Sequence, residues 1–502
     1  MDSADPAPWS VAALVLIPLL GAVALWLLHR PRGIVAVIAV ATTLITAAAA
    51  LDLAVRVTTL GPLGIAVGGW SAPLGIKLYA DALAVVLLVL TAIVMVLVNL
   101  YAASEESSKD PVYWPTLYAL WTGLNVLFLS GDIFNLYVAL EIVSLAAVVL
   151  VALARTPVAL QAALRYLLYA LFGSLAFLLG VALLYTHYGT LDLAELATVV
   201  EPEPVAWLAW SAVIGGLLIK TALFPLHSWL PAAHSSAPAA VSALLSGLVV
   251  KTGIYLLWRL SFWTFDALMT PAAQQFLGAL GAFAVVYGSL LALQQARLKR
   301  LVAYSTVAQL GYLMLLLSLG PHAWTGALLF LLSHGLAKTA LFLATGNVVR
   351  VFGHDRLAEL HGGPPNLALT GLTIGICAVA IAGLPPSAGF IAKWLLIESA
   401  LAQGQWWWSV PLIVGSLLGA AYMLHAVRWL FIVEASPAQG GDKVTPPLGP
   451  VHQGVPMALA LAALGLGLLT APLAGVFVLG EPPGEPLAPG STTVLANPEV
   501  TP

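Results

Sequence analysis

Charged side chains are scarce in this sequence. Only 8% of its 502 residues are Asp, Glu, Lys or Arg, whereas 61% are hydrophobic, and the mean hydropathy is +0.99. Soluble domains carry about 25% charged residues. The composition therefore excludes a water-soluble protein and predicts a polytopic membrane protein. The net charge of -3 is too small to indicate nucleic-acid binding.

Cysteine is nearly absent, and positive charge is missing from the first residues. The single cysteine, Cys377, excludes an internal disulfide and an iron–sulfur cluster ligated by this chain, because such clusters need several Cys ligands. The segment MDSADPAPWS contains two aspartates and no Lys or Arg. A secretory signal begins with a positive region, so we expect the first apolar run to be retained as a membrane span.

Fourteen apolar stretches are candidates for spanning helices, which need about 20 mostly apolar residues. They lie at about 9–28, 33–55, 80–102, 112–130, 133–154, 159–187, 205–231, 238–262, 272–295, 300–318, 322–349, 367–402, 408–434 and 455–479. Pro225 breaks the seventh and Pro385–Pro386 the twelfth, because proline interrupts helices. The sequence thus predicts an all-α polytopic membrane protein of about 14 transmembrane helices. Glycines and prolines at 61–79 predict a hairpin-like loop.

Lys and Arg are unevenly distributed among the predicted loops. Loops after even-numbered spans contain three, Arg56, Lys77 and Arg259, the last at a helix end. Loops after odd-numbered spans contain ten: Arg30, Arg32, Lys109, Arg155, Arg297, Lys299, Arg300, Arg350, Arg356 and Lys443. Cytoplasmic loops carry an excess of positive residues. The distribution therefore predicts that both termini are extracytoplasmic.

Six ionisable side chains lie inside predicted spans: Glu141, Lys220, Lys251, His334, Lys338 and Lys393. An ammonium at the centre of a bilayer helix costs about 2.5–3.5 kcal/mol, so such groups are functional candidates. His334 precedes Lys338 by one turn, and both face one side of the helix. Burial and a nearby carboxylate act in opposite directions on the proton affinity of a lysine, and histidine titrates near neutrality. We interpret the six as a proton path. The alternative is ion pairing that only joins helices.

Four further polar residues are auxiliary candidates: Arg165, His227, His234 and Glu398. Arg165 either extends to the cytoplasmic surface or supports the path. The two histidines flank the break at Pro225, where they either relay protons or satisfy backbone groups. Glu398 is either an exit group or solvated. The sequence indicates no catalytic, cofactor-binding or metal-binding residue.

Five segments carry a resemblance to a known family. They are GDIFNLYVALEIVSL (131–145), LLIKTALFPLHSWLPAAHSSAP (217–238), RLKRLVAYSTVAQLGY (297–312), SHGLAKTALFLATG (333–346) and GLPPSAGFIAKWLL (383–396). They resemble the antiporter-like subunits shared by respiratory complex I, membrane-bound hydrogenases and Mrp-type multisubunit cation/proton antiporters, over about residues 80–435. GDIFNLYVALE and GGWSAPLGIKLYADALA are most similar to the Mrp-type D subunit.

The resemblance implies fourteen spans with two inverted five-helix repeats and a proton route along a central polar axis. Residues 1–111 would form an N-terminal three-span segment with the hairpin-like loop, 112–262 the first repeat (spans 4–8), 263–434 the second (spans 9–13), and 435–502 the last span and a flexible tail. By position, Glu141 and Lys220 resemble the family's carboxylate–lysine pair, and Lys251 its central lysine. His334 and Lys338 match the eleventh-span polar positions, and Lys393 the twelfth-span group. The resemblance implies no redox cofactor in this chain.

We therefore expect a proton-translocating subunit of a multisubunit Na⁺/H⁺ (monovalent cation/proton) antiporter in a bacterial plasma membrane. Its partners would be other membrane subunits, protons, Na⁺ or another monovalent cation, and lipid. Pairing of Lys220 with Glu141 would weaken the hold on the proton of Lys251. The alternative is a proton-pumping subunit of complex I or of a membrane-bound hydrogenase, whose redox site lies outside this chain. A third hypothesis is a non-conducting structural subunit, or one that energises inorganic-carbon uptake.

Overall fold

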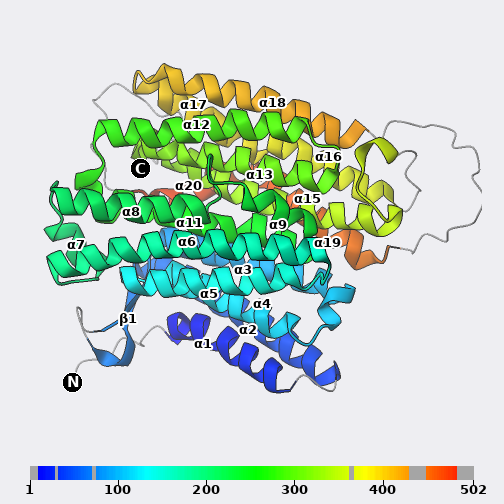
Figure 1. The fold of residues 1–502 in the computed structure, drawn as a ribbon, viewed down its shortest axis with the longest axis horizontal. Helices are drawn as coiled ribbons and strands as arrows, with labels where there is room; N and C mark the ends of the chain where they lie inside the picture. The colour runs from blue at the N-terminus through cyan, green and yellow to red at the C-terminus, as the bar shows by residue number, and fades with distance from the viewer. Residues whose placement is uncertain (1–8, 29–31, 71–74, 361–366, 429–447, 483–502) are drawn as a thin grey trace, which may run out of the picture.

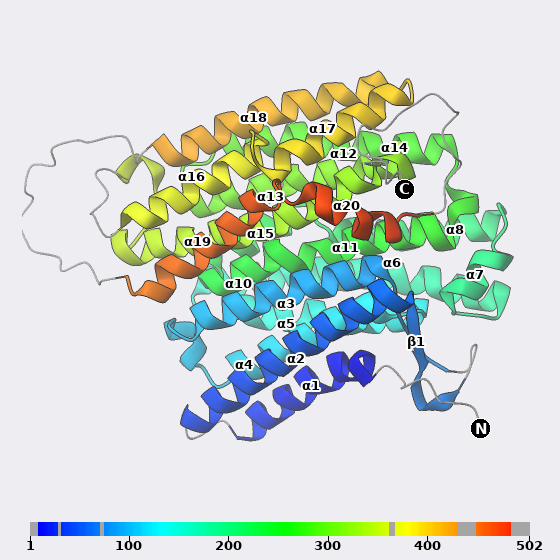
Figure 2. The same ribbon diagram turned by 180° about the vertical axis from the view of Figure 1, so that it is seen from behind.

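The computed structural model describes residues 9–28, 32–70, 75–360, 367–428 and 448–482. Most of the predicted tail after residue 480, together with Arg30 and Lys443, lies outside these ranges. Long helices lie side by side and form one bundle (Figures 1 and 2). Their bounds are α1 Trp9–Leu27, α2 Arg32–Leu60, α3 Ala82–Ala102, α4 Tyr113–Leu129, α5 Ile133–Ala152, α6 Pro157–Tyr188, α7 Leu193–Val199, α8 Pro204–Lys220, α9 Trp229–Ser236, α10 Ala239–Leu244, α11 Val250–Arg259, α12 Pro271–Leu293, α13 Leu298–Met314, α14 Leu316–Leu319, α15 Trp324–Phe352, α16 Ala368–Ala382, α17 Ala388–Ala402, α18 Ser409–Val427, α19 Pro450–Gly465 and α20 Thr470–Leu479.

The expectation of a mostly helical, polytopic fold is confirmed. Among the described residues, ten helices are long and apolar enough to cross a membrane, or eleven if the bent pair α19 and α20 counts as one span. Each of the fourteen predicted stretches contains helix, but α8 and α16 are shorter apolar helices beside a break. The count of fourteen and the two inverted repeats therefore stay predictions.

Both predicted breaks are present. α8 already ends at Lys220, before Pro225, and Ala222 takes a left-handed conformation with φ 55°. The indole Nε1 of Trp229, the first residue of α9, donates to the carbonyl of Ile219 at 2.9 Å and so satisfies a group at the end of α8. The second break separates α16 from α17 around Pro385–Pro386.

The last predicted span is not one straight helix. α19 and α20 meet at an angle of 81°. Gly467 lies in the bend, and a Cβ there would come within 2.4 Å of the carbonyl oxygen of Pro386. Only glycine allows so close an approach, so the bend packs directly against the break between α16 and α17.

The hairpin-like loop is a true β-hairpin, which adds a small sheet to the otherwise helical fold. Strands β1 (Leu63–Ala66) and β2 (Lys77–Ala80) pair antiparallel, with Leu63 opposite Ala80. The hairpin lies at one end of the bundle (Figure 1). α20 ends beside it, since Gly480 lies against Ala82 and Leu83 at the start of α3.

Three spans form the centre of the bundle. The apolar windows of Ala239–Thr264, Leu298–Leu319 and Pro321–Phe352 are 100%, 94% and 94% buried, compared with 33% for α1 and α2. A helix that is buried all round is enclosed by protein. The lysines on these central helices therefore face other helices.

A buried ion pair joins the hairpin end of the bundle to the centre. Asp81 caps the N-terminus of α3, and Arg259 is the last residue of α11. The Arg259 guanidinium donates to both carboxylate oxygens of Asp81, at 2.5 and 2.6 Å. It also lies 4.9 Å from the ring of Trp263. Breaking such a pair from one side leaves an uncompensated buried charge.

We predict that Arg259→Leu destabilises the protein by about 3–5 kcal/mol, because it strands the Asp81 carboxylate. The matched control is Arg56→Leu, which breaks the partly exposed Arg56–Asp52 pair on α2 and should cost about 0–1 kcal/mol. The measurement is the thermal unfolding midpoint of the purified assembly in detergent. Equal midpoints for the two variants would contradict the prediction.

Candidate functional site

Glu141 and Lys220 form an ion pair between α5 and α8. The Lys220 amine lies 3.1 Å from Glu141 Oε1 and donates to the Ser144 hydroxyl at 2.9 Å. The Ser174 hydroxyl, from α6, donates to the same oxygen of Glu141. Lys220 can reach α5 because it is the last residue of α8, where the helix breaks. The side chain of Lys220 is 5% exposed and that of Glu141 19%, so the acid is open toward the surface of the chain.

Lys251 lies in the interior just after an irregular turn. Residues Leu245–Val249 form a π-helical turn between α10 and α11, and π turns frequently mark functional positions. The Lys251 amine donates to the carbonyl of Ser246 in this turn at 2.7 Å. Its exposure is 1%, and no carboxylate contacts it among the described residues.

Hydroxyls of the π turn and of α13 lie between Lys251 and Lys338, without one continuous chain of hydrogen bonds among the described residues. The Ser246 hydroxyl lies 2.9 Å from that of Thr306 on α13. The neighbouring Ser305 accepts a hydrogen bond from the Lys338 amine of α15, which also donates to the carbonyl of Val302 at 2.9 Å. The π turn and α13 therefore bring together two lysines that the sequence places in different halves of the chain.

His334 lies one turn before Lys338 on α15, with 4% of its surface exposed. Neither ring nitrogen has a hydrogen-bond partner. The ring faces a gap lined by Gln309, Ala380 and Ile381, among others, which is too narrow for a water molecule. An unpartnered buried polar group is costly. A proton could pass here only after the side chains move or water enters.

Lys393 lies beyond this gap, on α17. Its amine donates to the carbonyls of Ile381 and Ala382, the last two residues of α16, at 3.1 and 3.0 Å. It also lies 4.6 Å from the ring of Tyr312. Gly383, which follows Ala382, has φ 76°, and a Cβ there would come within 2.8 Å of the Lys393 side chain. The break thus supplies both the carbonyls and the room for this lysine.

The auxiliary candidates separate into two groups. His234 on α9 is completely buried, has two unpartnered ring nitrogens, and stacks on Phe342 at 4.8 Å. His227 is buried in the first break, and its Nδ1 is unpartnered. Arg165 is exposed on the outer face of α6, away from the buried lysines, and Glu398 is half-buried on α17.

The arrangement has three stations. The first station is the Glu141–Lys220 pair, the second is Lys251 together with Lys338, and the third is Lys393. No hydrogen bond joins Lys220 to Lys251 in the part of the chain that the structure describes. Their helices are nevertheless close, because a Cβ at Gly253 would come within 2.1 Å of the Thr221 hydroxyl.

Sequence reasoning missed the hydroxyls that lie around these stations: Ser144, Ser174, Ser246, Ser305 and Thr306. Ser144 could have been found, since it follows Glu141 by one turn. The Ser246–Thr306 contact joins residues 60 positions apart, and no local spacing indicates it. Among the described residues, no group of three or more His, Cys, Asp or Glu is placed to hold a metal ion.

Comparisons with known proteins identify the family of this chain. Residues 130–419, more than half of the chain, match the family described as the transmembrane part of NADH:quinone oxidoreductase and Mrp antiporters. Relatives include the N subunit of NADH-quinone oxidoreductase from Desulforudis audaxviator, 37% identical over 93% of this chain and 94% of the relative. Another is the D subunit of the Na(+)/H(+) antiporter from Bacillus subtilis, 31% identical over 97% of both chains.

Solved structures of membrane complexes contain chains with the same fold. A chain of the Mrp complex from Dietzia sp. superposes with a TM-score of 0.87 at 26% identity, covering 94% of this chain and 96% of the other. A chain of the membrane-bound sulfane sulfur reductase, an archaeal respiratory membrane complex, gives a TM-score of 0.86 at 29% identity with the same coverage. This chain therefore belongs to the NADH:quinone oxidoreductase/Mrp antiporter membrane-subunit family.

Proposed function

We propose that the chain is the proton-translocating subunit of a multisubunit Na⁺/H⁺ antiporter in a bacterial plasma membrane. The observation that carries the proposal is the buried set of four lysines, Lys220, Lys251, Lys338 and Lys393, each at most 8% exposed. Among the described residues, three of them contact only neutral oxygens and rings. Purely structural lysines would gain more from a counter-ion, so this arrangement favours groups that gain and lose a proton.

Each station has a distinct role in this proposal. Glu141 holds Lys220 in its charged form when the two are paired, and the hydroxyls of Ser144 and Ser174 keep the pair in place. Lys251 and Lys338 share protons through the Ser246, Thr306 and Ser305 hydroxyls. Lys393 is the last station, oriented by the carbonyls at the end of α16. The spaces between the stations must hydrate for a proton to cross them.

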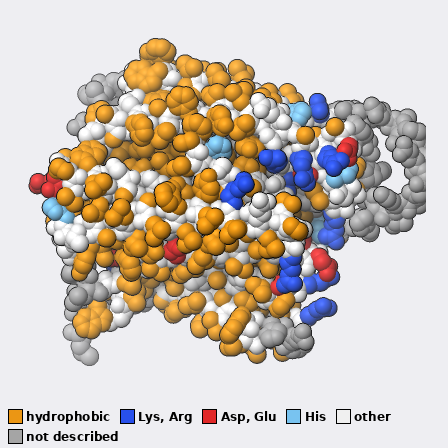
Figure 3. Space-filling model, in the orientation of Figure 1, with side chains coloured by type: hydrophobic (Ala, Val, Ile, Leu, Met, Phe, Trp, Pro, Cys, Tyr) orange, Lys and Arg blue, Asp and Glu red, His pale blue; other side chains and the backbone are white. Residues whose placement is uncertain are grey.

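The charge distribution supports an orientation. Lys and Arg gather at the end of the bundle opposite the hairpin (Figure 3). By the positive-inside rule this end is cytoplasmic. α20 ends beside the hairpin, and α1 begins near the hairpin end of the bundle (Figure 2). The charge distribution thus supports the proposal that both termini lie outside the cytoplasm.

A second candidate function is supported by the 37% identity to the N subunit of an NADH-quinone oxidoreductase. In that case the same lysines would pump protons in a redox-driven complex, with other membrane subunits as partners and the redox chemistry elsewhere. Purification of the assembly distinguishes the two functions. Small antiporter subunits support antiport, whereas subunits that bind redox cofactors support the second function.

We predict that Glu141→Gln lowers cation-dependent proton exchange at least about a hundredfold, because positioned proton-transfer groups contribute about 10²–10⁴-fold. Lys220→Ala should act similarly. The measurement is the cation-induced change in pH gradient in everted vesicles that contain the complete assembly, normalised to protein level. The control is Glu203→Gln, which removes an exposed acid paired with His187. Normal exchange in both test variants would refute the proposal.

We also predict that Lys393→Arg abolishes exchange. Arginine keeps the charge but does not release a proton at physiological pH. The matched control is Lys77→Arg in strand β2, away from the buried lysines, and it should exchange as the wild type does. Full activity of Lys393→Arg would mean that Lys393 never deprotonates during transport.

A further inference from the structure

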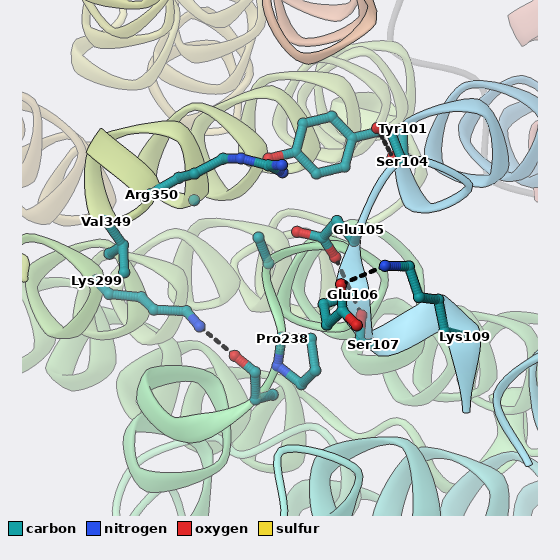
Figure 4. Close-up of a pocket in the computed structure, with 13 residues that line it drawn as sticks. Tyr101, Ser104, Glu105, Glu106, Ser107, Lys109, Pro238, Lys299, Val349 and Arg350 are labelled. Carbon is teal, nitrogen blue, oxygen red and sulfur yellow. Dashed lines mark hydrogen bonds and ion pairs between the residues drawn. The ribbon is translucent and has the colours of Figure 1, made fainter. Parts of the chain in front are cut away.

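A pocket of about 480 Å³ opens at the basic end of the bundle, away from the stations described above. It lies where the end of α3, the start of α13 and the end of α15 meet the break between α9 and α10 (Figure 4). Tyr101, Glu105, Pro238, Lys299 and Arg350 line it. None of these residues belongs to the proton path proposed above.

Two acids line this pocket, and Glu105 is the less exposed of them, because Glu106 is 85% exposed and pairs with Lys109. Glu105 follows α3, and its carboxyl group points into the pocket, opposite Lys299 and Arg350 (Figure 4). Burial raises the pKa of Glu105 above its usual value, while the charge of Lys299 and the backbone amide of Ala240 act against this rise. The titratable and charged groups that surround it are Tyr101, Glu106, Lys109, Tyr113, Lys299, Arg350 and His452.

The floor of the pocket leads toward the buried lysines. The Lys299 amine donates to the carbonyl of Ala237, in the link between α9 and α10. One turn earlier on α9 lies His234, with its two unpartnered nitrogens. The His234 ring stacks on Phe342, which follows Lys338 by one turn on α15. His234 therefore lies between the pocket and the second station.

An anion site fits this pocket less well. The two basic groups already have acceptors, because Lys299 donates to Ala237 and Arg350 contacts His452 Nε2 at 2.7 Å. The Glu105 carboxyl would also repel a phosphate or carboxylate ligand. A site for exchanging protons with water uses all of these groups and requires no further ligand.

We propose that this pocket is the cytoplasmic mouth of the proton path. Glu105 exchanges protons with water, and Lys299 and His234 carry them between Glu105 and Lys338. Each step breaks one O–H or N–H bond and forms another on the next oxygen or nitrogen, so no co-reactant is needed. The inference rests on the proposed function and adds the connection to solvent that the three stations lack.

The test uses Glu105→Gln in everted vesicles that contain the complete assembly, whose cytoplasmic face is in contact with the buffer. We expect exchange to fall at least about tenfold, with the largest loss at alkaline pH, where protons are scarcest. Glu105→Asp keeps a carboxyl group and should restore most of the rate. The matched control is Glu106→Gln, whose side chain is 85% exposed and pairs with Lys109, and it should exchange normally.

The outcomes separate the two proposals. Normal exchange by Glu105→Gln, beside loss in Glu141→Gln, would overturn the mouth and leave the proposed function standing. Normal exchange by both would refute the proposed function. A loss that is equal at every pH and is not restored by aspartate would make Glu105 structural and also overturn the mouth. If Glu105→Gln fails to assemble, His234→Gln carries the test. A tenfold loss in His234→Gln supports the route, and a normal rate contradicts it.

Discussion

The rest of this structure depends on the cost of burying lysine amines away from water. An unpaired ammonium is strongly disfavoured in a low-dielectric interior, yet the centre of this bundle contains several lysine amines. Lys251 and Lys338 are balanced only by carbonyl and hydroxyl oxygens. The π turn supplies the carbonyl that contacts Lys251, and the second helix break supplies the carbonyls that contact Lys393. The helix breaks and the π turn are therefore parts of one solution to a single electrostatic problem.

The two breaks solve this problem in different ways. At the first, Lys220 ends its helix and reaches across to a carboxylate, while a tryptophan takes over the freed carbonyl of Ile219. At the second, Lys393 itself takes the freed carbonyls, and no carboxylate contacts it among the described residues. One station thus has a counter-ion and the other has dipoles only. In the proposed proton path, the two end stations therefore differ in whether a counter-ion is present.

Much of the fold could be predicted from sequence, because bilayer thickness and proline chemistry act locally. Apolar length located the helices, and the proline positions located both breaks. The 81° bend after α19 was missed, because it depends on contact between Gly467 and the distant Pro386. The same holds for the site. Charges inside apolar runs identified the lysines, whereas the Ser246–Thr306 bridge is a tertiary contact that no helical spacing indicates.

The structure shows stations that are separated from one another, and this agrees with a transporter that must not let protons leak. A continuous wire of water from Glu141 to Lys393 would let protons cross without any coupling to a second ion. The gap at His334 admits no water, and no hydrogen bond joins Lys220 to Lys251 in the described chain. Conduction along the proposed path would therefore need transient hydration or side-chain movement at two places. Those two places are where the binding of a cation, or the movement of a neighbouring subunit, could control the proton.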